Sequence, residues 1–130
     1  MSLQAYQTAA TRAESPRETE YRLFGFVTGE LIRVQSAGRG DLHKFVEAID
    51  RNRRMWSAFS TDCATDGNGL PNDLRAQIVS IAGWVSRYSS EVIRDGADID
   101  PLIDVNKNVM QGLAPAAACL LPELPPGVVV

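Results

Sequence analysis

The stretch from Asp62 to Asp73 carries the residues best suited to chemistry, because it spaces carboxylates and glycines as a calcium-binding loop does. Asp62, Asp66 and Asp73 match the first, fifth and twelfth positions of an EF-hand, and Gly67 matches the sixth. Ala64, however, stands where a third oxygen ligand is required, and the last acid is an aspartate rather than the bidentate glutamate. We therefore predict a turn that reverses the chain, and no calcium site.

The other polar residues form no recognisable catalytic set. His43 is the single histidine, and it falls on the polar side of a predicted helix. Four carboxylates gather around a predicted helix start, where negative charge complements the helix dipole: Asp95, Asp98, Asp100 and Asp104. We predict a protein that is not an enzyme and that carries no metal or cofactor.

The segment Arg51 to Phe59, R-N-R-R-M-W-S-A-F, interleaves cations with aromatic rings, as nucleic-acid-binding segments do. At about 100° per residue, however, its three arginines project in different directions, whereas a helix that tracks phosphates aims its cations one way. Trp56 and Phe59 instead point to the core. We expect Asn52, Arg53 and Trp56 to form a half-buried structural latch.

The remaining two arginines of this segment, Arg51 and Arg54, are expected on the solvent side, available for carboxylates of a partner. The chain as a whole is acidic, with a net charge of −3 and a pI of about 5.1. No global positive field therefore exists to hold a polyphosphate, which argues against direct nucleic-acid binding.

Helical periodicity dominates the chain, and no segment alternates as a strand does. Capping residues, prolines and glycines divide it into a short segment at 3–13 and four longer helices, at about 15–38, 42–60, 71–95 and 100–112. Short connections favour antiparallel neighbours, so we predict an all-α bundle of four to five helices over residues 1–113. Residues 114–130 hold four prolines and are predicted to form a flexible tail, with a docking peptide as the alternative.

Apolar stripes at helical spacing predict the core. The first stripe comprises Leu23, Phe24, Val27, Leu31 and Val34, the second Leu42, Phe45, Val46, Ile49, Trp56 and Phe59, the third Leu74, Ile78, Ile81, Val85, Tyr88 and Val92, and the last Leu102, Val105, Val109 and Leu113. Cys63 and Cys119 are expected to be free thiols in a reducing compartment. The chain shows no signal-peptide pattern and no long apolar run, which predicts a soluble cytoplasmic protein.

The first long helix carries more apolar surface than one core requires. Glycines at positions 25 and 29 leave one strip of it without side chains, which permits close approach of another helix. Either an internal helix fills this strip, or the strip is a groove for an amphipathic helix of a partner. The candidate partner-binding residues are Tyr21, Gly25, Phe26, Gly29 and Ile32.

An ordered set of segments carries a family resemblance. It comprises S-P-R-E-T-E-Y-R-L-F at 15–24, N-R-R-M-W-S-A-F at 52–59, L-P-N-D-L-R-A-Q-I at 70–78, W-V-S-R-Y-S at 84–89 and L-I-D-V-N-K-N-V-M-Q-G-L at 102–113. In this order and spacing the chain resembles the FlaF family, flagellar biosynthesis regulators of alphaproteobacteria, over about residues 5–113.

The resemblance implies a small cytoplasmic protein required for flagellin synthesis and export. It implies a secretion chaperone that binds flagellin and works alongside FlbT, a regulator of flagellin mRNA translation. Two alternatives remain open: a regulator of flagellin mRNA, acting directly or through FlbT, and a helical adaptor that binds FlbT only. The family has no catalytic residues to transfer onto this chain.

Overall fold

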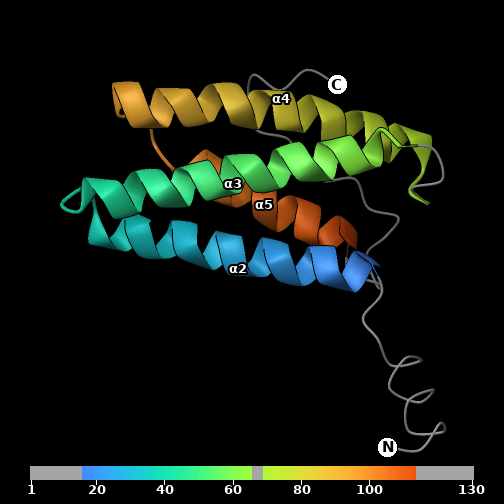
Figure 1. The fold of residues 1–130 in the computed structure, drawn as a ribbon, viewed down its shortest axis with the longest axis horizontal. Coiled ribbons are helices and arrows are strands. Elements are labelled where there is room, and N and C mark those ends of the chain that lie inside the picture. The colour runs from blue at the N-terminus through green and yellow to red at the C-terminus, as the bar shows by residue number, and fades with distance from the viewer. Residues whose placement is uncertain (1–15, 66–68, 114–130) are drawn as a thin grey trace, which may run out of the picture.

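The computed structural model describes residues 16–65 and 69–113, and within these ranges the protein is all-α, as predicted (Figure 1). The helices are α2 (Pro16–Ala37), α3 (Leu42–Cys63), α4 (Asn72–Asp95) and α5 (Asp100–Leu113). The expected helix at 3–13 and the tail at 114–130 lie outside the described residues.

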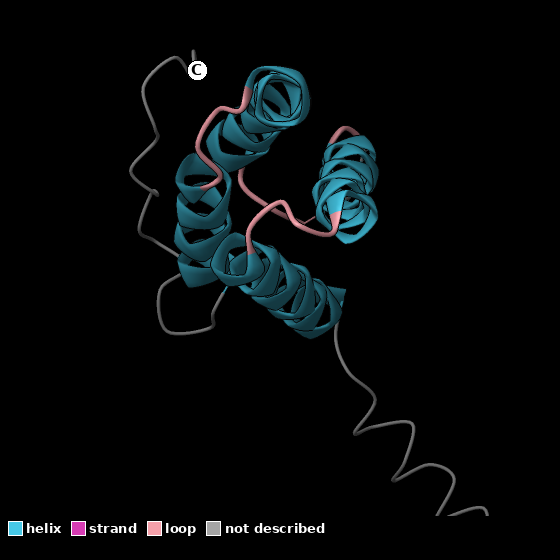
Figure 2. Ribbon diagram, turned by 90° about the vertical axis from the view of Figure 1, so that its left-hand side faces the viewer, coloured by secondary structure: helices cyan, strands magenta, loops and turns pink. Residues whose placement is uncertain are grey.

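The four helices run alternately up and down around a shared core. Figure 1 shows the α2–α3 and α4–α5 connections at one end of the bundle, and the start of α2 and the end of α5 at the other. The view from the connection end shows the helices surrounding a common centre (Figure 2). The main helix pairs in contact are α3 with α4, α2 with α3, and α2 with α5.

Local signals account for the helix boundaries. The side chain of Asp41 accepts a hydrogen bond from the backbone N–H of Lys44 at 3.2 Å, which caps α3. Gly38 and Gly96 follow α2 and α4 with φ of 74° and 71°, a conformation that glycine adopts without steric cost. The predicted end of the second long helix was early, because α3 continues beyond Ser60 to Cys63.

The core joins all four helices. Its largest fully buried side chains include Trp56, Phe24, Leu31, Ile49, Ile78, Ile81 and Leu102. Phe24 packs edge-on against Trp56 and Phe59, each with ring centroids 5.2 Å apart. Because both aromatic rings of the Arg51–Phe59 segment are buried in this cluster, neither is exposed as a platform for a nucleic-acid base.

Two residues assigned to the core are exposed instead. Leu42 is 58% exposed because it is the first residue of α3, at the end of the bundle. One turn further, Phe45 is buried beneath the guanidinium of Arg39, which lies 4.3 Å from its ring centre. Leu23 is 47% exposed. It lies about 100° around α2 from the buried Phe24, and this rotation turns it away from the core.

Candidate functional site

A buried polar network crosses the centre of the bundle. The indole N–H of Trp56 on α3 donates to Asn106 Oδ1 on α5 at 2.7 Å. Asn106 Nδ2 in turn donates to Asn52 Oδ1 on α3 at 2.8 Å and to Thr28 Oγ1 on α2 at 3.1 Å. All four residues are buried. Asn106 therefore links three helices through hydrogen bonds that the core makes inaccessible to water.

The structure places only two of the three predicted latch residues in this network. Arg53 is half-buried, and no hydrogen bond is found for its buried Nε atom. Asn106 and Thr28 were not predicted as members. The sequence did contain a signal for Asn106, because it interrupts the apolar face that Leu102 and Val109 define in the last helix.

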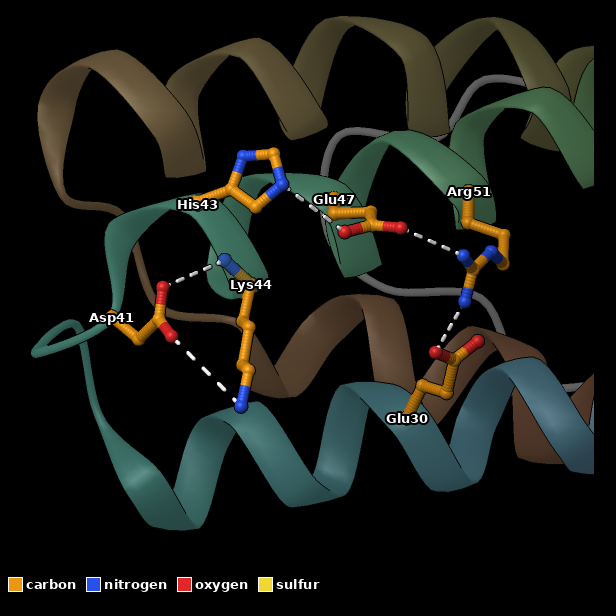
Figure 3. Close-up of polar contacts among 6 residues, drawn as sticks. All are labelled: Glu30, Asp41, His43, Lys44, Glu47 and Arg51. Carbon is orange, nitrogen blue, oxygen red and sulfur yellow. Dashed lines mark hydrogen bonds and ion pairs between the residues drawn. The ribbon is translucent and has the colours of Figure 1, made fainter.

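A second set of polar residues lines the boundary between α2 and α3 (Figure 3). The Arg51 guanidinium on α3 pairs with Glu30 on α2, and it also donates to Glu47 at 3.0 Å. The hydrogen bond to Glu30 is the main reason that the pKa of Arg51 is raised. Arg54 contacts Asp50 at 3.1 Å, one turn earlier in the same helix. The two arginines expected to be available for a partner are thus both paired within the chain.

The Arg51–Glu30 pair stands at the edge of a shallow cleft of about 370 Å³. Val34, Phe45 and Ala48 contribute apolar side chains to this cleft, and the α2–α3 connection closes one end. His43 lies on the outer surface, with Nε2 3.5 Å from Glu47 (Figure 3). Within residues 16–65 and 69–113, no three or more histidine, cysteine, aspartate or glutamate side chains are grouped to hold a metal ion.

The third candidate region is the outward surface of α2, which we call the α2 surface. Its members are Tyr21, Leu23, Phe26 and Ile32, with exposed fractions of 42%, 47%, 58% and 38%. They make up four of the six large hydrophobic side chains exposed in the described part of the chain. A helix in a small bundle gains stability by burying such side chains, so their concentration on one helix indicates a contact surface.

The two glycines of α2 have different neighbours. A Cβ atom built at Gly25 would lie 3.5 Å from Met110 Cε of α5, so an internal helix covers this position. A Cβ atom at Gly29 would meet only the side chain of Arg33, in the same helix, at 3.5 Å. At Gly25, an internal helix, α5, therefore fills the strip. At Gly29, the nearest neighbour is the flexible side chain of Arg33 in the same helix.

The α2 surface is broad rather than a single narrow groove. On a helical wheel Tyr21 and Ile32 lie within about 20° of each other, whereas Phe26 projects about 140° from Tyr21. A partner that touched all three would have to wrap around the outer side of α2. Among the predicted binding residues, Tyr21, Gly25, Gly29 and Ile32 therefore share one side of α2, and Phe26 lies on another.

Comparison with known proteins gives one match. No curated protein and no solved structure matches the chain. None of the described helices has the length and apolar character needed to cross a membrane. The sequence does match the family described as flagellar protein FlaF, over residues 2–113. This match takes in all four helices of the bundle and stops where α5 ends. The chain therefore belongs to the FlaF family and is a flagellar protein.

Proposed function

We propose that this protein is a flagellin-binding secretion chaperone that acts with FlbT, and that it works by binding alone, without catalysis. In this proposal the helical bundle holds an amphipathic helix of an unassembled flagellin subunit. The bound helix is unavailable for premature polymerisation, and the subunit stays competent for export. Membership of the FlaF family supports a role in the flagellum. The exposed apolar side chains of the α2 surface support binding of a partner helix.

The observation that carries the proposal is the exposure of Tyr21, Phe26 and Ile32 on one helix. Tyr21 and Ile32 share one side of α2 and suit a partner helix that presents its own apolar face, and Phe26 extends the apolar surface to another side of α2. The central contacts would exclude water and supply most of the affinity, because a few large apolar residues dominate typical interfaces.

Titration of purified flagellin into the full-length protein, followed by calorimetry and by size-exclusion chromatography, tests the proposal. Ile32→Asp and Phe26→Asp each place a charge in the proposed contact, and we expect at least about a tenfold loss of affinity from each. Val79→Asp is the matched control, because Val79 is 44% exposed on α4. Absence of a complex, with and without FlbT, would refute flagellin binding.

Parallel titrations with FlbT alone and with the flagellin mRNA leader separate the two alternatives. An adaptor would form a complex with FlbT and none with flagellin. A direct regulator of translation would bind the flagellin mRNA leader in a manner that weakens steeply with salt. The internal pairing of Arg51 with Glu30 and of Arg54 with Asp50 disfavours phosphate contacts from these side chains. Direct RNA binding is therefore the weaker candidate.

A further inference from the structure

Exposed apolar side chains and an acidic ion cluster lie on the same face of the α2–α3 helix pair. Glu30 on α2 pairs with Arg51 on α3, which fixes the register of the two helices. Leu23 precedes Glu30 by seven residues, and Ala58 follows Arg51 by seven. Because seven residues complete about two turns, Leu23 and Ala58 lie level with each other on the face of the ion pair. Phe26, one turn from Glu30, lies on this face as well.

We call this surface the α2–α3 face, and its apolar part is open to solvent. Leu23 and Phe26 are 47% and 58% exposed, and the small side chain of Ala58 is exposed beside them. Tyr21 and Ile32 lie about 160–180° around α2 from Leu23, on the side that α5 contacts. The α2–α3 face therefore shares only Phe26 with the contact proposed for flagellin.

The other part of the α2–α3 face is the cleft of about 370 Å³, to whose lining Val34 and Ala48 contribute apolar groups. At its edge the carboxylates of Glu30 and Glu47 share the single guanidinium of Arg51 (Figure 3). The Oε1 atom of Glu30 is buried and has no hydrogen-bond partner among the residues described. This ion cluster therefore holds one negative charge in excess, and one of its carboxylate oxygens lacks a donor.

The neighbouring cations do not offset this excess charge. Arg22 and Arg33 project from α2 about 60–80° away from Glu30, on the side remote from α3. Lys44 and Arg54 each pair with an aspartate close by in sequence. The centre of the α2–α3 face is thus complementary to a cation, and its apolar part begins one helical turn away.

We propose that the α2–α3 face is a docking surface for an amphipathic helix of another protein, which carries a lysine or arginine one to two turns from its apolar residues. The apolar residues of that helix pack on Leu23, Phe26 and Ala58. Its basic side chain lays its methylene groups along the apolar lining of the cleft, and the charged end pairs with Glu47. The spacing follows from α2, where Phe26 and Leu23 are about 6 and 10 Å from Glu30 along the helix axis.

Synthetic peptides test this proposal on the full-length protein. The probe is a helical peptide of about 18 residues, five turns, made of alanine, glutamine and leucine, with one lysine on the leucine face. A second peptide carries glutamate in place of that lysine. In calorimetric titrations we expect the lysine peptide to bind at least about tenfold more tightly, with a preference that narrows as salt is added. The titrations contain no flagellin, so their outcome is independent of the proposed function.

Two matched pairs of variants locate the binding site. Leu23→Ser should weaken binding of the lysine peptide at least about fivefold, whereas Val79→Ser, at a position 44% exposed on α4, should leave it unchanged. Glu47→Gln should remove most of the preference for lysine over glutamate, and Glu91→Gln, which changes an exposed carboxylate on α4, should preserve it. Circular dichroism verifies that each variant is folded.

The peptides and the variants can each overturn the proposal. Equal affinity of the two peptides, or no binding of the lysine peptide, would exclude a site for a basic helix. Equal effects within either matched pair of variants would show that the peptide binds elsewhere on the protein.

Discussion

Trp56 on α3 and Asn106 on α5 are joined by a 2.7 Å hydrogen bond across 50 positions of sequence. The bond holds together two helices that are not neighbours along the chain. It also determines the rotation of α5, because an amide that faced solvent would leave the indole N–H without a partner in the core. The first prediction follows from this bond.

Asn106→Ala should lower the free energy of unfolding by about 2–6 kcal/mol, because it orphans the indole N–H of Trp56 and the Oδ1 atom of Asn52, at about 1–3 kcal/mol for each unpaired group. Urea denaturation followed by tryptophan fluorescence measures the change. Lys107→Ala is the control, since Lys107 is the exposed neighbour in the same helix. Equal stability of the two variants would show that the network contributes nothing.

Trp56→Ala should destabilise the bundle by about 3–5 kcal/mol, the usual cost of truncating a buried tryptophan. Trp56 is fully buried and contacts both Phe24 and Phe59. Partner binding and cooperative thermal unfolding, measured by circular dichroism, should therefore be lost together. A variant that unfolds like the parent protein and has lost only its partner would contradict the assignment of Trp56 to the core.

Arg51→Ala should reduce stability more than Arg54→Ala does. Arg51 joins two helices through Glu30, whose side chain is only 19% exposed, and its removal leaves that carboxylate without its cation. Arg54 pairs with Asp50 within α3, where both side chains are largely in solvent. The urea midpoint of each variant, measured at low and at high salt, gives its loss of stability. A larger loss for Arg54→Ala than for Arg51→Ala would contradict this prediction.

Gly29→Ala and Gly83→Ala should each raise the free energy of unfolding by about 1 kcal/mol, because alanine favours helix over glycine. A new Cβ atom meets only the guanidinium of Arg33 at 3.5 Å in the first case and that of Arg87 at 3.4 Å in the second. Chemical denaturation measures the gain. If the strip beside Gly29 binds flagellin, only Gly29→Ala weakens binding, and equal effects of the two variants on binding would exclude the strip.

The Cys63 thiol should react slowly with thiol reagents, and it should make the stability of the protein fall at alkaline pH. Burial raises the pKa of its thiol from 9.0 to about 11. Because the raised pKa belongs to the folded state, this stabilisation is complete below pH 9 and is lost as the pH rises towards 11. In a Cys119→Ser background, a thiol reagent at pH 8 should therefore modify Cys63 only at the rate of unfolding.

The matched comparison for this pH dependence is Cys63→Ala in the same background. Tyr88, whose pKa is also raised by burial, is present in both proteins. The difference between the two stability profiles thus reports Cys63. Parallel profiles from pH 8 to 11, or rapid modification of the folded protein, would contradict a buried neutral thiol.

Local sequence determined where the helices begin and end. Asp41 caps α3 with its own side chain, and Gly38 and Gly96 adopt the left-handed conformation after α2 and α4. These effects act over a few residues, so a single chain segment contains all the information they require. The all-α class and the apolar stripe of α4 were predictable for the same reason, and the ordered motifs identified the family.

Tertiary structure decided how the stripes face one another. Glycine spacing suggested a strip on α2, but only the packing against α5 shows that Met110 covers Gly25. Similarly, Arg51 projects towards solvent on a wheel, yet the position of α2 brings Glu30 to it. Such pairings join residues far apart in sequence, and their energies depend on the rotation and offset of whole helices. Local periodicity carries no information about either quantity.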